Sequence, residues 1–341
     1  MSSNFSLEVN KKKNNTLPWE QSKHPDILFP LVGLQSLLAE MDWESSEWIK
    51  YWLEKNGGNL AYSSWASGVK SDWIWGLGLP FISDLKRFSS FDSERRLFGL
   101  SALPGCGKTT LGKWLESAAK ELNFSLKVIS LDDFYLPGDE MELAMKNNPW
   151  NVPRGLPGSH SLSVLEECLG KWLSTGFLEA PQFDKSLRGG LGDRSSWIKT
   201  TPELLVLEGW FLGCHPEELI SNEIENEDIR HLRITADEKE YRKKVQKLLF
   251  NYLPIWQKID RLWHIKIDNF SSSFKWKIEQ EKRMLASKGA ALQGEKLTDF
   301  IRMIQASIPQ RSLMNIDSDV TIEINNSRQI LNIASKDRKL N

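Results

Sequence analysis

Residues 96–110 read RLFGLSALPGCGKTT, and this stretch decides the fold. Its first half, residues 97–101, is an apolar run with the composition of a buried strand. A helix-period pattern follows over residues 108–122. Between the two, residues 102–109 match the Walker A pattern, with Ala102 where its first Gly is expected. A strand that enters this loop and a helix that leaves it are the context in which the pattern binds phosphate.

The loop has the residue types that hold the phosphates of a nucleotide. Gly105 and Gly107 permit positive φ, so successive backbone N–H groups can face one anion. Lys108 can reach the terminal phosphates, and Thr109 can offer its hydroxyl to Mg²⁺. The thiol of Cys106 has two interpretations, a small residue that fits the loop or a redox switch. We expect ATP and Mg²⁺ to bind at Gly105, Cys106, Gly107, Lys108, Thr109 and Thr110.

Apolar, strand-like runs alternate with helical patterns along the rest of this region. The predicted strands cover residues 97–101, 126–131, 204–207, 231–236, 262–267 and 320–324. The predicted helices cover residues 108–122, 161–175, 238–253, 270–288 and 298–308. This alternation predicts an α/β fold with a mainly parallel sheet flanked by helices.

The N-terminal part has a different pattern. Residues 1–26 are polar and are predicted to form a disordered tail, and residues 27–94 are predicted to form a helical extension. Seven of the 15 Trp lie before residue 80. We expect these Trp to bury the extension against the α/β domain, residues 95–341, and the alternative is a stacking surface for a ring-bearing ligand.

The composition, with 40% hydrophobic and 26% charged residues, is that of an average soluble globular protein. A net charge of −1 creates no global field that would attract nucleic acid. No apolar run is long enough to span a membrane. The three Cys have no paired spacing, and no signal-peptide pattern is present. We therefore expect a cytoplasmic protein with small-molecule partners and no nucleic-acid or membrane partner.

Carboxylates follow two of the predicted strands. Asp132 and Asp133 come after the second strand, and Glu208 comes after the third. Ligands of open α/β sheets bind outside the carboxyl ends of the strands, so these acids should face the phosphate loop. One Asp can accept the proton of an attacking hydroxyl, and Asp133, Glu208 and Thr109 are candidates to hold Mg²⁺. The alternative is that the acids cap turns or form ion pairs.

Two loops between the second and third strands carry cations among Gly and Pro residues. The first contains Arg154 and His160, and the second, predicted as a loop over residues 181–194, contains Lys185 and Arg194. Cations on rigid loops suit a small anionic acceptor or the transferring phosphoryl group. We expect these four side chains to bind the acceptor. The alternative is ordinary surface loops with solvated charges and a structural His.

Together these motifs resemble the D-glycerate 3-kinases of the plant and cyanobacterial type, within the phosphoribulokinase, uridine kinase and pantothenate kinase group. The resemblance covers about residues 95–330 and rests on residues 105–110, 132–135, 154–160, 181–194, 208–210 and 274–281. Asp132, followed by Phe134 and Tyr135, is similar to the small-molecule kinases whose matching Asp is the base. The loop with Lys185 and Arg194 resembles a glycerate site.

The resemblance implies an ATP-dependent kinase domain over residues 95–341 that converts D-glycerate to 3-phosphoglycerate. It implies that Asp132 is the catalytic base and that Lys108, Lys185 and Arg194 are catalytic cations. Two alternatives are a kinase for another acceptor, such as a nucleoside, pantothenate or a sugar phosphate, and a non-kinase protein that uses ATP as a switch. The acids beside a cationic loop favour a kinase.

Overall fold

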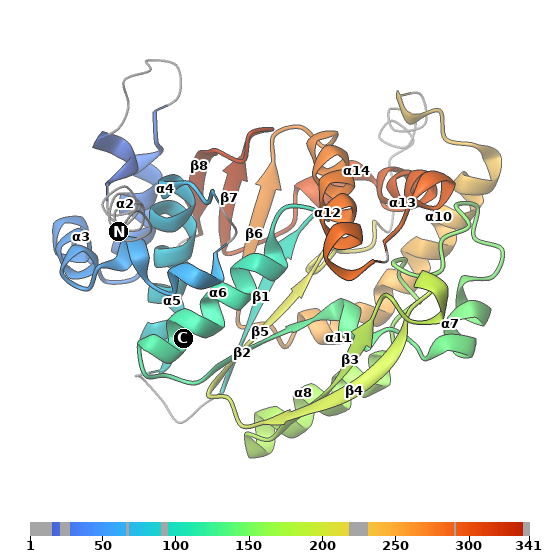
Figure 1. Cartoon of the computed structure of the whole chain (residues 1–341), viewed down its shortest axis with the longest axis horizontal. Coiled ribbons are helices and arrows are strands. Elements are labelled where there is room, and N and C mark those ends of the chain that lie inside the picture. The colour runs from blue at the N-terminus through green and yellow to red at the C-terminus, as the bar shows by residue number, and fades with distance from the viewer. Residues whose placement is uncertain are drawn as a thin grey trace.

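A six-stranded sheet forms the centre of the computed structural model, which describes residues 16–20, 28–65, 68–89, 95–217, 231–289 and 291–336 (Figure 1). The strand order is β2-β5-β1-β6-β7-β8. The bounds are β1 Arg96–Ala102, β2 Leu126–Ser130, β5 Leu204–Gly209, β6 Arg261–Ile267, β7 Val320–Ile324 and β8 Ile330–Ser335. The first five strands of this order are parallel, and β8 is antiparallel to β7. The predicted mainly parallel sheet is confirmed.

Helices follow most of the strands and flank the sheet (Figure 1). In the α/β region they are α6 Lys108–Glu121, α7 Gly138–Met145, α8 Leu162–Thr175, α10 Ala236–Leu249, α11 Leu253–Trp256, α12 Ser272–Lys288, α13 Gly294–Ala306 and α14 Gln310–Met314. Every residue of β5 is buried, as a central strand covered on both faces requires. Across the ranges given above, no helix is both long and apolar enough to cross a bilayer.

The register of the central strands brings their carboxyl ends to one level. Glu208 of β5 pairs with Leu100 of β1 and with Ser130 of β2. The phosphate loop after β1, the turn after β2 and Glu208 therefore meet at one edge of the sheet. Since β7 runs parallel to β6 and β1, the β7–β8 turn lies at the same edge, on the opposite side of β1 from β2.

The strand predicted at residues 231–236 is wrong. Residues 231–232 are helical, and α10 begins at Ala236. Thr235 caps this helix: its hydroxyl accepts from Glu238 N at 3.2 Å, and the Glu238 carboxylate accepts from Thr235 N at 2.9 Å. This reciprocal capping box satisfies two backbone donors that a strand would have to pair elsewhere.

The loop predicted over residues 181–194 is largely a hairpin. Strands β3 (Leu178–Asp184) and β4 (Asp193–Thr200) pair antiparallel and form a second, two-stranded sheet. Pro181 and the Gly-rich turn, which indicate a loop, lie within or beside these strands. Their pairing depends on contacts with α8 and with the 3₁₀ turn Leu131–Phe134, which are distant in sequence. The sequence patterns also do not predict α7 or β8.

The N-terminal arm, residues 28–89, packs helices against one end of the sheet (Figure 1). It contains α2 Leu31–Glu40, α3 Ser45–Glu54 and α4 Ser71–Trp73, and a π-helical turn at Ile74–Gly78 leads into α5 Leu79–Ser89. Trp48, Trp52 and Trp75 are fully buried, and the rings of Trp48 and Trp75 meet edge to face at 5.9 Å. The Trp-rich segment is therefore a packed helical extension, as predicted.

Part of the predicted tail belongs to this packed extension. Residues 16–20 include the 3₁₀ helix Pro18–Glu20, and the ring of Trp19 lies 5.4 Å from Phe29 and 6.2 Å from Trp75. Leu17 is buried. Residues 1–15 and 21–26, the rest of the predicted tail, lie outside the described residues. We retain residues 27–94 and 95–341 as the proposed division of the chain.

A buried charge cluster joins the arm to the sheet. Asp84 of α5 is fully buried and accepts hydrogen bonds from Arg261 Nε and, at 2.9 Å, from Trp263 Nε1, both on β6. Arg87 Nε lies 3.1 Å from the same carboxylate, and Arg261 Nη1 lies 2.8 Å from Glu40 of α2. Burial raises the pKa of Asp84, and the charge of Arg261 opposes this rise. The cluster thus fixes α2 and α5 on the central strands.

Replacing Asp84 should destabilise the whole chain. Asp84→Ala leaves Arg261 buried with less compensating charge, so we expect a loss of about 3 kcal/mol in the free energy of unfolding. The matched control is Asp139→Ala, which removes an exposed ion-paired carboxylate and should change stability by less than about 0.5 kcal/mol. Urea unfolding monitored by Trp fluorescence measures both. Equal small losses would show that the cluster does not hold the arm.

Candidate active site

The loop between β1 and α6 has the backbone that an anion site requires. Gly105 and Gly107 have φ of 83° and 96°, as predicted from their residue type. An added Cβ at Gly105 would lie 2.8 Å from Lys277 N, so this position also needs Gly for the close approach of α12. Helix α6 begins at Lys108 and directs its N-terminal end at the loop.

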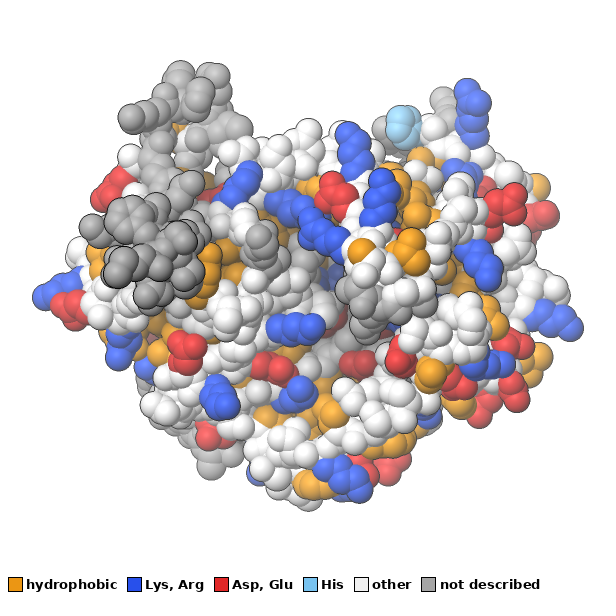
Figure 2. All heavy atoms as spheres, viewed as in Figure 1, with side chains coloured by type: hydrophobic (Ala, Val, Ile, Leu, Met, Phe, Trp, Pro, Cys, Tyr) orange, Lys and Arg blue, Asp and Glu red, His pale blue; other side chains and the backbone are white. Residues whose placement is uncertain are grey.

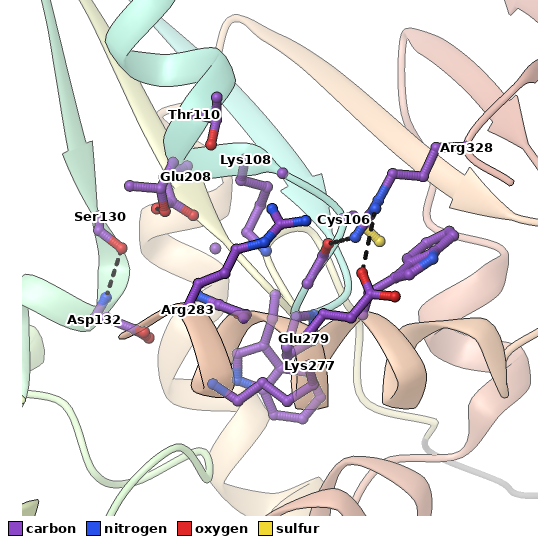
Figure 3. Close-up of a pocket in the computed structure, with 18 of the residues that line it drawn as sticks. Cys106, Lys108, Thr110, Ser130, Asp132, Glu208, Lys277, Glu279, Arg283 and Arg328 are labelled. Carbon is purple, nitrogen blue, oxygen red and sulfur yellow. Dashed lines mark hydrogen bonds and ion pairs between the residues drawn. The ribbon is translucent and has the colours of Figure 1, made fainter. Parts of the chain in front are cut away.

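Lys108, Thr109 and Glu208 line one cavity at the strand ends, and Figure 3 shows Lys108 near Glu208. Lys108 Nζ donates to Ala102 O at 2.5 Å and to Leu103 O at 3.2 Å, so the side chain curls over its own loop. Thr109 Oγ1 donates to Glu208 Oε1 at 3.3 Å. The structure therefore brings together three of the predicted residues.

Glu208 is a buried carboxylate in the wall of this cavity. Burial raises the pKa of Glu208, and the nearby charge of Lys108 opposes the rise. A buried acid next to the Thr109 hydroxyl is a donor set of hard oxygens, the kind that Mg²⁺ prefers. Within the ranges the structure describes, no group of three or more His, Cys, Asp or Glu could hold a metal ion by itself. An ion here would take its other ligands from phosphate oxygens and water.

Asp132, in the turn after β2, lines the same cavity, and both of its carboxylate oxygens accept hydrogen bonds. Lys185 Nζ donates to its Oδ2 at 2.6 Å, and the Tyr135 hydroxyl donates to its Oδ1 at 2.8 Å. Burial by itself would raise the pKa of Asp132, but the charge and hydrogen bond of Lys185 outweigh it and hold the pKa well below the usual range. Asp132 is therefore ionised at all ordinary pH values.

Asp133 has a different role from its neighbour. Its Oδ2 accepts from Ser130 N at 3.2 Å, and its Oδ1 accepts from Phe183 N at 3.3 Å. The first bond is part of a capping box on the 3₁₀ turn, and the second ties this turn to β3. Both oxygens thus have backbone partners, while Asp133 also lines the cavity, so its role as a metal ligand stays a prediction.

Three predicted acceptor contacts do not line the cavity. Arg154 is buried and donates to Gly190 O at 2.9 Å and to Leu191 O at 2.6 Å. Arg194 Nε donates to Tyr135 O at 3.0 Å. His160 stacks on Tyr135 with ring centroids 4.6 Å apart, and its Nδ1 lies 2.8 Å from the Tyr252 hydroxyl. Burial lowers the pKa of His160 to about 4, so its ring is neutral.

These three side chains therefore hold the hairpin turn and Tyr135 in place. Tyr135 in turn holds Asp132 through its hydroxyl. The sequence predicts that these segments lie near the site, and they do. Their side chains bind elsewhere because a cation in a Gly-rich loop can bind a backbone carbonyl as well as a ligand. Only Lys185 of the predicted acceptor residues lines the cavity.

The cavity has a volume of about 620 Å³ and includes residues that the motifs do not indicate. Arg328, in the β7–β8 turn, donates through Nη2 to Gly105 O at 3.2 Å, and its guanidinium lies 4.6 Å from the Trp276 ring. Figure 3 shows Glu279 of α12 beside it, and Glu279 Oε2 lies 3.7 Å from Arg328 Nη1. The one sequence signal for Arg328 is the Asn-Asn-Ser turn between two apolar runs, which marks a hairpin.

Cys106 is buried and its pKa is raised to about 11, so a reactive thiolate is not formed.

Comparison with known proteins finds several kinases that are similar to this chain. No family model matches the chain. The chain is 32% identical over 217 residues to "Uncharacterized kinase mug58" of Schizosaccharomyces pombe, a match that covers 60% of this chain and 76% of that protein. It is 33% identical over 218 residues to the chloroplastic D-glycerate 3-kinase of Arabidopsis thaliana. It is 31% identical over 193 residues to "Probable ATP-dependent kinase TDA10" of Saccharomyces cerevisiae.

The chain belongs to the same family of ATP-dependent kinases as these three proteins. The Arabidopsis match covers 60% of this chain but only 45% of that enzyme, and the TDA10 match covers 52% and 63%. Two solved structures share the fold at 24% identity. The D-glycerate 3-kinase of Cryptococcus neoformans has a TM-score of 0.62, with 76% of this chain and 97% of that chain covered. The YGR205w protein has a TM-score of 0.57, with 74% and 94% covered.

The two adjacent acids of this kinase should differ in their effect on turnover. We expect Asp132→Asn to lower kcat by roughly 10²–10⁴-fold, because the amide cannot accept a proton, and to change the KM for ATP little. Asp133→Asn should cost much less kcat, because its amide oxygen can still accept one backbone hydrogen bond. Steady-state kinetics of the pair decides between them. A larger loss at Asp133 would move the base by one residue.

The pH profile should report the charge of Lys185. In the wild type Lys185 lowers the pKa of Asp132. The fall in kcat caused by protonation of Asp132 should therefore occur at a pH below the usual pKa of an Asp. In Lys185→Met the main opposition to burial is lost and the Tyr135 hydrogen bond remains, so the pKa of Asp132 rises. As the pH falls, the variant should therefore lose activity at a higher pH than the wild type does. The matched control is Lys199→Met, an exposed cation on β4. An unchanged acid limb in Lys185→Met would contradict the pairing.

Proposed function

We propose that this kinase transfers the γ-phosphoryl group of ATP to D-glycerate and forms 3-phosphoglycerate. One observation supports this above all: the phosphate loop and the Asp132–Lys185 pair line the same cavity. The family includes an enzyme named D-glycerate 3-kinase, which makes a small hydroxy acid the acceptor to test first. We also propose that it acts in the cytoplasm, as the free, buried Cys106, Cys168 and Cys214 suit a reducing compartment.

The proposed reaction is a direct transfer. The acceptor hydroxyl donates a hydrogen bond to Asp132 and attacks the γ-phosphorus. The new P–O bond forms as the bond to the β-phosphate oxygen breaks, and the hydroxyl proton passes to Asp132. A loose transition state places little demand on the strength of the base, so an Asp of low pKa can orient the hydroxyl and take its proton late.

Cations of this chain would balance the charge of the transfer. Lys108 would leave its contacts with Ala102 and Leu103 for the terminal phosphates. Lys185, now bound to Asp132, would be released to the acceptor carboxylate or the transferring group when the hydroxyl replaces it. Mg²⁺, when bound by Thr109 and Glu208, would neutralise charge on the β- and γ-phosphates.

The acceptor end of the cavity fits a small anion. Lys277 Nζ is buried 2.5 Å from Glu281 and lies 4.8 Å from the Phe300 ring, and the cavity wall there also includes Trp210. Aromatic rings line this end, and Lys185 and Lys277, paired with Asp132 and Glu281, are the cations that an acceptor carboxylate could reach. A small hydroxy acid offers such a carboxylate, which an uncharged nucleoside does not.

A coupled ADP-release assay tests the proposal. We expect D-glycerate to stimulate ADP release at least tenfold more than uridine, pantothenate or ribulose 5-phosphate, because of these four only D-glycerate combines a carboxylate with a three-carbon chain. Lys108→Ala should abolish the stimulation by removing a cation from the phosphates. Phosphorus NMR of the product should identify 3-phosphoglycerate.

Each outcome of this assay has a separate meaning. A nucleoside or sugar phosphate that outperforms glycerate would overturn the acceptor and leave the kinase. ADP release that no acceptor stimulates would overturn the transfer reaction and support an ATP-dependent switch.

A further inference from the structure

The cavity extends past the phosphate loop toward the N-terminal arm. Asp132 follows β2, on one side of β1, and the β7–β8 turn lies on the other side. The wall on that other side includes Val69, Lys70 and Trp73 of the arm and Ser327 and Arg328 of the turn. With phosphates on the loop and the acceptor at Asp132, this far end is where the nucleoside of the nucleotide has room.

The arm and the turn are joined at this end by three hydrogen bonds. Lys70 Nζ donates to Ser327 O at 3.1 Å, and Trp73 Nε1 donates to Arg328 O at 2.5 Å. Asp72 Oδ2 accepts from Ile330 N at 3.0 Å. Residues 70–73 and 327–330, far apart in sequence, therefore form one unit, which we name the arm–turn junction.

Trp73 places an aromatic ring directly beside the phosphate loop. A Cβ added at Gly107 would lie 3.6 Å from Cη2 and from Cζ3 of Trp73, which is van der Waals contact. Trp73 is only 6% exposed, and its indole N–H is bonded to Arg328 O, so its ring forms part of the packed wall. Arg328 completes this side, since its guanidinium lies on Trp276 and bonds to the loop at Gly105 O.

We propose that the arm–turn junction seats the purine base of the nucleotide, with Trp73 as the side chain that packs against it. The N-terminal arm is then part of the nucleotide site. The inference rests on the proposed placement of ATP phosphates on the loop. It also assigns to one of the arm's Trp the ring-binding role that the sequence offers as an alternative to packing. A base needs a flat apolar wall beside polar backbone groups, and Trp73 and the turn supply both.

Calorimetric titrations with ADP and with pyrophosphate test the proposal, because pyrophosphate has the phosphates but no base. Trp73→Ala should weaken ADP binding by about tenfold, the usual cost of losing an aromatic contact with a base. It should change pyrophosphate binding by less than about twofold, because the phosphate contacts remain. Trp73→Phe keeps a ring but no N–H donor, and its loss for ADP should be smaller.

Two controls complete the experiment. Trp43→Ala removes a half-buried arm Trp that packs on Tyr51 and does not line the cavity, and it should leave both affinities unchanged. Lys108→Ala should weaken both ligands. Equal weakening of ADP and pyrophosphate by Trp73→Phe, or no weakening of ADP by Trp73→Ala, would overturn the proposal. No acceptor is present, so the result stands apart from the glycerate assay.

Discussion

The carboxylate of Asp84, buried against Arg261 and Trp263, holds the N-terminal arm on the central sheet. Helix α5 carries Asp84, and the π-helical turn before α5 leads directly to α4 and Trp73. A buried charge without its partner costs far more than an exposed one, so this contact permits little displacement of the arm. The position of Trp73 beside Gly107, and of the turn that Trp73 binds, depends on it.

At the strand ends, the pKa values of two acids in the cavity wall, Asp132 and Glu208, are shifted in opposite directions. Burial raises the pKa of Glu208, whereas Lys185 in direct contact lowers that of Asp132 despite its burial. Both acids sit among the cations Lys108 and Lys185, and the difference arises because only Asp132 has one in hydrogen-bond contact. Asp132 is thus kept as an anion for a hydroxyl, and Glu208 remains a site that gains from a cation.

Much of the site could be predicted because it follows local chemistry. Gly105, Gly107, Lys108 and Thr109 lie in one loop, and the acids follow apolar strands, so residue type and spacing were enough. The hairpin of β3 and β4 was not predictable in this way, since its strands contain Pro181 and pair through contacts with distant elements. The sequence predicts that three further side chains lie near the site: Arg154, Arg194 and His160. Residue spacing does not predict their hydrogen-bond partners, which come from other parts of the chain.

The sequence by itself determined the phosphate loop, the α/β order and the acids at the strand ends, because each depends on neighbours within a few residues or on strand direction. Only the tertiary structure decided what each acid contacts: Lys185 and Tyr135 donate to Asp132, whereas backbone donors from β3 and the turn bind Asp133. Only the tertiary structure brought Trp73 and Arg328, about 255 residues apart, to one loop. Such contacts depend on the packing of whole elements, which local patterns do not encode.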